Sequence, residues 1–347
     1  MLSFQQGPTV CFSSALRHRL TFIGPKSNVH LSQEGVDGIT GASVVDGQDA
    51  CVREVRRQIG TGADWIKIYG GVWLDLAMSC SYPFLLDYGC RSRLQDVSPT
   101  LARRSTPTFN KGELEAMVSA AHARGVKVAA HANTADAARD LLEAGVDSLE
   151  HGAEIYDEST RDRSVLRKLY QCNSSTTWIP TLSAYYIASL GGTDAAKERW
   201  ARCQITFQEA VRLGLENIAC GGDTGVFAHG QNALELVLMR RLGASWDRVL
   251  SWATYRGWLC VRGSEWEGDW GERYLASLLK DDKPTVELDR GVPFGLLRAG
   301  WAADLIGISG KLDGTEEEFE DAVMNGVQFV MKGGVIFKEN GLELYPV

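Results

Sequence analysis

From about residue 60 onward, short apolar runs alternate with stretches in which apolar side chains recur at helical spacing. A short apolar run bounded by turn-forming residues is typical of a buried strand, and a period of three to four residues is typical of an amphipathic helix. Strands that alternate with helices favour parallel βαβ units. The runs predict strands over residues 63–69, 126–132, 146–152, 176–186 and 217–223, with helices between them.

The helix before the second of these strands carries clear start and stop signals. Asn110 and Glu113 have the spacing of a capping box, in which each side chain accepts a hydrogen bond from the other residue's backbone amide. The apolar positions that follow at helical spacing are Leu114, Met117, Val118 and Ala121. Gly125 ends this helix, and Gly145 ends the next one, predicted over 134–145, because glycine is favoured just after a helix C-terminus.

An open doubly wound sheet and a (β/α)8 TIM barrel both fit this alternation, and the positions of polar residues separate them. In a barrel, the chemistry collects at the C-terminal ends of several different strands. Here each of four predicted strands has a polar residue near its end: Lys67, His131, His151 and Asp223. The pattern therefore favours an α/β barrel.

The last part of the chain has a different pattern. Residues 292–341 are rich in short apolar runs separated by turn glycines, which predicts a small β-rich appendage after the barrel. We therefore place a barrel domain over residues 1–291 and a β-rich domain over 292–347.

Composition and charge narrow the function classes. Of 347 residues, 44% are hydrophobic and 23% are charged, which is ordinary for a globular protein, and the net charge of -8 gives no footprint for nucleic acid. The eight cysteines form no C-x-x-C pair and indicate reduced thiols. The N-terminus lacks the layout of a signal peptide, and no run reaches the ~20 apolar residues of a membrane span. We expect a soluble cytoplasmic protein with no membrane partner.

Each of the four strand-end residues also has an ordinary structural interpretation. Lys67 could extend its amine to water from a strand end, or it could lose its proton in a pocket and react with carbon dioxide to form a metal-bridging carbamate. His131 or His151, taken singly, is better explained as a hydrogen-bonded core residue, and Asp223 as a turn residue.

Taken together, the four residues favour a metal site. The chain has six histidines, and two of them end consecutive predicted strands. Neutral imidazoles and carboxylates are the ligands that Zn²⁺ and related divalent ions need. Such an ion lowers the pKa of bound water, and Asp223 could both bind the ion and take the proton from the attacking water. One or two divalent ions, with zinc favoured, are therefore the expected cofactor.

The order of several motifs along the chain resembles the amidohydrolase superfamily, with the imidazolonepropionase- and prolidase-like metal hydrolases, fungal members included, as the most similar branch. The motifs are "GADWIKIY", "TPTFNKGELEAMVSAAHARGVKVAAHANT", "LLEAGVDSLEHG", "WIPTLSAYY", "GGDTGVFAHGQNALELVLM" and "RAGWAADLIGISG" with "VQFVMKGGVIFK". The similarity runs from about residue 20 to 338.

The resemblance assigns roles to individual residues. It implies that Lys67 is the carboxylated lysine that bridges the metals, that His131 and His151 are ligands of the second metal, and that Asp223 is a ligand and the general base. It also implies that His229 and either Tyr185 or Tyr186 face the substrate. Core packing explains the two tyrosines equally well.

The sequence departs from the family at its front. The family carries a His-x-His pair on its first barrel strand, and this sequence contains no such pair. The match begins near the family's third strand, so we expect an incomplete barrel with the first strands missing. Unpaired strand edges and apolar faces would then be open to water or to another copy of the chain, which makes a homo-oligomer an expected assembly.

A second departure is the apolar stretch 70–86, which follows the lysine strand where relatives continue directly. A substrate lid and a translated intron are both compatible with it, and we favour the intron. Transcript reads that join Tyr69 to Asp87 without the stretch would support the intron.

Three functions are compatible with these features. The first is a metal-dependent hydrolase of carbon–nitrogen bonds, acting on a small amide, a cyclic amide or a dipeptide-like substrate. The second is a catalytically impaired fragment or binding protein on the same scaffold, because the His-x-His ligands are absent. The third is a mononuclear deaminase, against which Lys67 in "DWIKI" argues. The first is the expected function.

Overall fold

The computed structural model describes residues 10–14, 43–72, 106–107, 109–171, 176–224, 226–262, 273, 276 and 293–344. The chain divides into two compact units, an N-terminal unit that ends at Trp178 and a C-terminal unit that begins at Ile179, and each is described by itself. The boundary predicted between residues 291 and 292 stays a prediction. Residues 73–86 of the apolar stretch lie outside the described residues.

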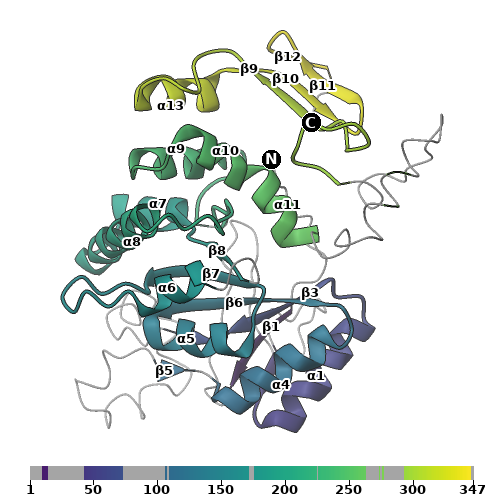
Figure 1. The fold of residues 1–347 in the computed structure, drawn as a ribbon, viewed down its shortest axis with the longest axis vertical. Helices are drawn as coiled ribbons and strands as arrows, with labels where there is room; N and C mark the ends of the chain where they lie inside the picture. Colours follow the sequence, from purple (N-terminus) through teal and green to yellow (C-terminus); the bar gives the residue numbers. More distant parts are fainter. Residues whose placement is uncertain are drawn as a thin grey trace. The chain divides into compact units, whose positions relative to one another are not determined.

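The N-terminal unit is built on a six-stranded sheet (Figure 1). Its strand order is β2-β1-β3-β6-β7-β8, and the pairs from β2 to β7 are parallel. The bounds are β2 Ser43–Val45, β1 Val10–Ser14, β3 Trp65–Tyr69, β6 Lys127–Thr134, β7 Ser148–Glu154 and β8 Thr177–Ile179. The prediction of a parallel α/β sheet is confirmed. Within the described ranges the sheet ends at β2 and β8 and forms no closed ring of eight strands.

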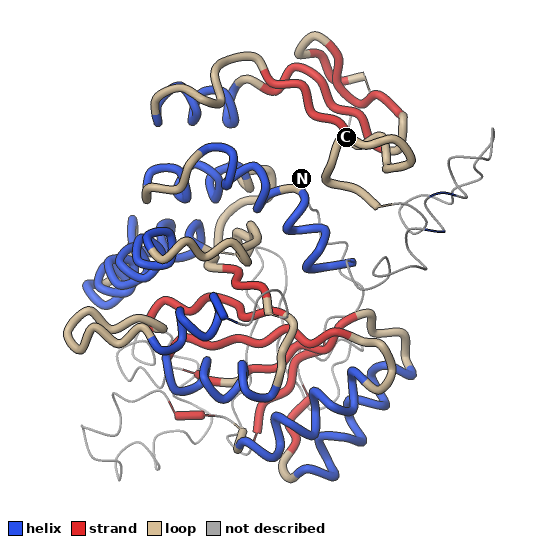
Figure 2. The backbone as a smooth tube through the Cα atoms, viewed as in Figure 1, coloured by secondary structure: helices blue, strands red, loops and turns tan. Residues whose placement is uncertain are grey.

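The two faces of this sheet differ in polarity. Alternate residues of β3 and β6 are fully buried, at Ile66, Ile68, Val128, Ala130 and Ala132. This face packs against α1 (Gln48–Gly60), α4 (Lys111–His122) and α5 (Ala135–Ala144), as Figures 1 and 2 show. The residues between them stay partly exposed on the opposite face, where Lys67 and His131 lie. Strand alternation therefore directs Lys67 and His131 to the open face, the one that these three helices leave uncovered, and the apolar residues to the helices.

The capping box predicted for α4 is confirmed. The Asn110 side chain accepts a hydrogen bond from the Glu113 amide at 3.0 Å, and Glu113 Oε2 accepts one from the Asn110 amide at 2.8 Å. The second oxygen of Glu113 accepts a hydrogen bond from the Gly47 amide at 2.8 Å, which joins the start of α4 to the start of α1. Gly145 ends α5 in a left-handed conformation, φ 84°, as predicted.

One predicted strand is shorter than expected, and another does not form. After β8 the chain continues not as a strand to residue 186 but as α7 (Leu182–Leu190), because Pro180 has no amide to donate to a ladder and Thr181 is left-handed, φ 51°. The stretch 217–223 forms only an isolated bridge at Ile218, and its backbone turns at Asp223, φ 59°.

The C-terminal unit contains a group of helices and a small antiparallel sheet. The helices are α7, α8 (Asp194–Arg212), α9 (Ala233–Arg241), α10 (Trp246–Ala253), α11 (Tyr255–Arg262) and α13 (Glu316–Asn325). The sheet has the order β12-β11-β10-β9, with β9 Leu305–Ile308, β10 Val327–Lys332, β11 Val335–Glu339 and β12 Leu342–Glu343. The prediction that the last part of the chain is rich in strands is confirmed.

Three further elements lie in the described part of the N-terminal unit. Strands β4 (Gly71–Val72) and β5 (Thr106–Pro107) form a short antiparallel pair, and α6 (Ser164–Gln171) follows β7. In the part of the chain that the structure describes, every helix is too short or too polar to cross a bilayer.

Candidate functional site

The rings of His131 and His151 meet on the open face of the parallel sheet. Their centroids lie 4.3 Å apart and their planes make an angle of 63°, an edge-to-face arrangement. His131 belongs to β6 and His151 to the neighbouring strand β7. The Tyr69 ring, on β3, lies 5.4 Å from the His131 ring. Three adjacent strands thus contribute one ring each to the same place.

Regular strand alternation does not explain the position of His151. In β7, Leu149 is fully buried and pairs with Ala130 on the helix-covered face, and His151 pairs with Ala132 on that same face. An undistorted strand would therefore point His151 away from His131. The backbone is left-handed at His151, φ 71°, and again at Gly152, φ 74°. This break in the strand turns the imidazole of His151 to the face that carries His131.

The two imidazoles are neutral at physiological pH. Burial, with a smaller contribution from the nearby positive charge of Lys67, lowers the pKa of His131 to about 3. Burial also holds the pKa of His151 well below its usual value, with smaller contributions from His131 and Lys67. A neutral imidazole keeps a lone pair that can bind a cation. The charge of Lys67 acts on both rings, so this lysine belongs to the same cluster.

One nitrogen of His131 is already hydrogen-bonded. The Asn133 side-chain amide nitrogen lies 3.0 Å from His131 Nε2, two residues further along β6 on the same face. With the Asn133 amide donating to Nε2, the ring proton is on Nδ1, so a cation at Nδ1 requires the amide to turn its oxygen to an Nε2–H. The orientation of the Asn133 amide thus decides which nitrogen of His131 carries the proton.

The other four predicted site residues belong to the C-terminal unit. Asp223 is partly exposed and left-handed, and its charge contributes to raising the pKa of the buried Glu235 carboxyl. His229 is exposed in a turn. Tyr185 and Tyr186 lie on α7, where the Tyr186 ring packs edge-on against Trp200 of α8 with centroids 5.5 Å apart. The Tyr186 ring thus has a packing partner, and its contact with substrate stays a prediction.

Left-handed backbone marks two of the predicted site residues. Among the described residues, five that are not glycine have positive φ, and His151 and Asp223 are two of them. Such a conformation costs energy for a residue with a Cβ atom and is found often at functional sites. This observation supports a functional assignment for both residues independently of the sequence motifs.

The cluster on the open face fits part of a divalent metal site. Two neutral imidazoles from adjacent strands are suitable ligands, and the Lys67 amine acts on both of them. Over the described ranges, however, no group of three or more His, Cys, Asp or Glu side chains is arranged to hold a metal ion. The N-terminal unit thus supplies a two-histidine half-site beside a lysine.

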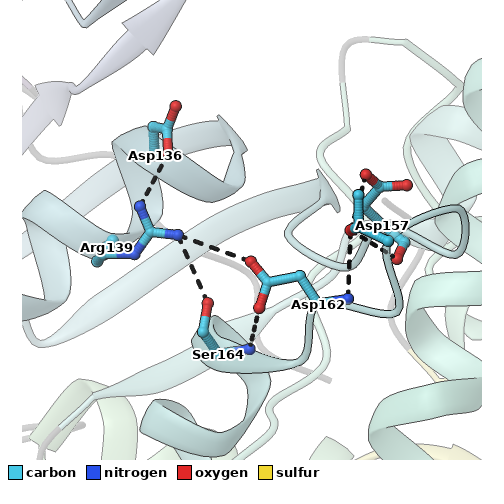
Figure 3. Close-up of polar contacts among 6 residues, drawn as sticks. Asp136, Arg139, Asp157, Asp162 and Ser164 are labelled. Atoms are coloured by element: carbon cyan, nitrogen blue, oxygen red, sulfur yellow. Dashed lines mark hydrogen bonds and ion pairs between the residues drawn. The ribbon is translucent and has the colours of Figure 1, made fainter.

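A polar network fixes the loop that follows β7 (Figure 3). The Arg139 guanidinium, on α5, lies 2.8 Å from Asp136 Oδ1 and 3.8 Å from Asp162 Oδ2. Asp162 Oδ1 accepts a hydrogen bond from the Ser164 amide at 2.8 Å, and Asp157 Oδ1 accepts one from the Ser159 hydroxyl at 2.6 Å. The loop immediately after the histidine strand is therefore tied to the neighbouring helix.

Two of the residues that sequence reasoning missed lie two positions from those it found. Tyr69 follows Lys67 and Asn133 follows His131 at a spacing of two, so strand alternation could have identified both. Trp178, whose indole nitrogen donates to the carbonyl oxygen of His151, has no such signal because it comes from another strand.

Comparison with known proteins gives a consistent picture of the fold. No family model matches the chain. Curated relatives include the uncharacterized proteins Rv2915c of Mycobacterium tuberculosis and Mb2939c of Mycobacterium bovis, each 23% identical over 218 residues, which are 59% of this chain and 50% of the relative. The chain thus spans about half the length of the curated relatives it matches.

Solved structures match over nearly the whole chain. A Xaa-Pro dipeptidase with bound methionine is 23% identical with a TM-score of 0.62, over 94% of this chain and 66% of that one. The A. niger ochratoxinase is 22% identical with a TM-score of 0.62, over 96% and 66%. Phenylurea hydrolase B is 16% identical with a TM-score of 0.54, over 87% and 59%. These similarities show a shared fold.

Proposed function

We propose that this chain, which has the fold of the amidohydrolase superfamily, hydrolyses a carbon–nitrogen bond of a small amide with the help of a divalent cation. The observation that carries the proposal is the pair of neutral imidazoles, His131 and His151, that meet beside Lys67 on the open face of the parallel sheet. His131 lies in the second half of β6 and His151 at the middle of β7, and enzymes of this architecture carry their chemistry toward the C-terminal ends of such strands.

The substrate class follows from the structural relatives. The names of three of them, a Xaa-Pro dipeptidase, an ochratoxinase and a phenylurea hydrolase, denote hydrolases. A dipeptide-like amide, a cyclic amide or another small amide is therefore the substrate that we propose for this chain.

His131 and His151 would hold the cation, and zinc is the ion that two imidazoles favour. A bound divalent cation lowers the pKa of its water toward neutrality and polarises a carbonyl oxygen. The positive charge of the Lys67 ammonium would repel a cation held by His131 and His151. Reaction of its free amine with carbon dioxide, with loss of one proton, would replace that positive charge by a carbamate oxygen ligand. On the sequence motif alone, we assign Asp223 as the base and His229 with Tyr185 or Tyr186 as substrate-facing residues.

One observation favours the second function, a catalytically impaired fragment or a binding protein. The described residues bring two histidines together but no third His, Cys, Asp or Glu ligand. Metal affinity depends on the number of ligands and on their geometry, so a half-site would bind a cation weakly.

Metal content and turnover distinguish the two functions. We would purify the chain with and without added Zn²⁺, measure bound metal by mass spectrometry, and assay hydrolysis of Xaa-Pro dipeptides and N-acyl amino acids. His131→Ala and His151→Ala should each lose metal and activity. His122→Ala is the matched control, because this histidine pairs with Asp147 at 2.8 Å and is not part of the ring pair.

The expected result is metal-dependent turnover that both site variants abolish and the control retains. Stoichiometric metal with no turnover on the whole panel would favour the binding protein. Neither metal nor turnover, in protein prepared with Zn²⁺, would overturn the hydrolase proposal.

A further inference from the structure

We propose that Trp178 is a positioning residue: its indole N–H holds the backbone of His151 in the left-handed conformation that brings the imidazole to His131. The inference deepens the proposed function, on which its relevance to metal binding rests. The geometry of the two rings can be tested without metal.

The indole of Trp178 is hydrogen-bonded at the point where the strand breaks. Its Nε1 donates to the carbonyl oxygen of His151 across 2.8 Å, and the side chain is fully buried. The acceptor is the carbonyl of the peptide that joins the two left-handed residues, His151 and Gly152. A hydrogen bond to this oxygen restricts the rotation of that peptide plane, and the plane sets the direction in which the strand continues.

The same indole excludes a side chain at position 152. A Cβ atom added to Gly152 would lie 2.8 Å from Trp178 Nε1 and 3.2 Å from Ile155 Cδ1. The φ of 74° is also unfavourable for any residue with a Cβ atom. Trp178 thus approaches the backbone closely enough that only glycine fits, which is the packing expected where a side chain supports a strained turn.

Without this support, the register of β7 directs His151 elsewhere. The residue pairs with Ala132 on the face that α4 and α5 cover, and a regular strand would place its ring there. The left-handed conformation costs energy that a histidine does not recover locally. The buried hydrogen bond from Trp178 offsets this cost, and the result is the 4.3 Å spacing between the two rings.

The test uses Trp178→Phe, which keeps an aromatic ring and removes the N–H donor. Trp252→Phe is the matched control, because Trp252 is also fully buried and donates its indole N–H to a backbone carbonyl, that of Glu216, at 3.2 Å. Both variants lose one buried indole hydrogen bond. Only Trp178→Phe should disturb the contact between the rings of His131 and His151.

Two readouts are measured on the full chain. In metal-free protein, the nuclear Overhauser effect between the ring protons of His131 and His151 reports their contact. In a titration with Co²⁺, the absorption bands of the bound ion report affinity and ligand geometry. Trp178→Phe should lose the Overhauser effect and weaken Co²⁺ binding at least tenfold, while Trp252→Phe keeps both. Retention of both by Trp178→Phe would overturn the inference.

The outcomes separate this inference from the proposed function. A wild-type protein that shows the Overhauser effect but binds no Co²⁺ contradicts the metal function, and the inference is then decided by the Overhauser effect in the variant. If Trp178→Phe does not fold, hydrogen exchange of the Trp178 indole in the wild type decides. Slow exchange supports the hydrogen bond, and exchange as fast as that of an exposed indole contradicts it.

Discussion

The carboxylate of Glu235 accepts two hydrogen bonds from Ser183, one from its backbone amide and one from its hydroxyl, each 2.7 Å long. The other carboxylate oxygen accepts a bond from the Leu182 amide at 2.9 Å. These two amides open α7, and the preceding Thr181 provides no side-chain cap. Glu235, on α9, therefore caps the first turn of α7 from another helix.

We predict that Glu235 makes the stability of the C-terminal unit depend on pH. Burial raises the pKa of its carboxyl to about 7, so the folded protein holds a proton between pH 4.5 and 7 that the unfolded chain releases. Its contribution is fully present below pH 4.5 and is lost as the pH rises to 7, by roughly 3 kcal/mol at most. Glu235→Gln cannot titrate. As the pH rises from 4.5 to 7, the free energy of unfolding in urea should therefore fall more for the wild type than for this variant. Parallel pH profiles for the two proteins would contradict the prediction.

We predict that Gly152→Ala destabilises the protein more than Gly145→Ala. Both glycines are left-handed, at φ 74° and 84°, but a Cβ atom at 145 meets nothing within 4 Å, whereas one at 152 lies 2.8 Å from Trp178 Nε1. The control should cost about 1–2 kcal/mol from its backbone alone. Overpacking should add a further 1–3 kcal/mol or so at 152. The free energy of unfolding of the two variants, measured in urea, tests this prediction. Equal losses would show that the Trp178 indole moves aside without loss of stability.

Asn133 provides a third prediction. Its amide engages Nε2 of His131, so a cation should bind Nδ1 while Nε2–H donates to the amide oxygen after a rotation of the Asn133 side chain. Asn133→Ala should therefore weaken Co²⁺ binding by about tenfold. Asn325→Ala, which removes an exposed amide bond to Asp321, is the control and should bind normally. Tighter binding by Asn133→Ala would instead identify Nε2 as the coordinating nitrogen.

Acid should destabilise the N-terminal unit through the histidine pair. The pKa of His131 is about 3 in the folded protein and about 6.5 when unfolded, so the unfolded chain gains a proton first as the pH falls. Stability is therefore complete above pH 6.5 and declines down to about pH 3. In metal-free protein, His131→Asn should show a shallower decline than the wild type between these values. Equally steep profiles would show that protonation of His131 in the folded protein costs no stability.

The features that sequence predicted were those with local or periodic signals. The Asn110–Glu113 box and the αL glycine at 145 depend on residues within one turn of each other, and both are present. The meeting of His131 and His151 was predicted from parallel strands that end at one edge, and the pair is observed. The first two inferences needed only spacing along the chain, and the third did not anticipate the left-handed backbone at His151 that brings the two rings together.

What could not be predicted depends on contacts between distant residues. The apolar run that follows Ile179 suits a strand, but Glu235, more than fifty residues later, supplies the acceptors that start a helix there. The rotation of His151 out of strand register depends on Trp178 in the same way. In both cases the two partners are far apart in the sequence. The local pattern therefore predicted a strand where α7 begins, and it gave no sign of the left-handed backbone at His151.

The close approach of an indole to position 152 also has an evolutionary consequence. Most single-base changes in a glycine codon replace the residue, and here each replacement would disturb the paired rings before it touched either histidine. A Cβ atom here also costs stability, so glycine should persist while Trp178 keeps its place, whether or not the pair is still used. Positions 152 and 178 should therefore change together in descendant genes.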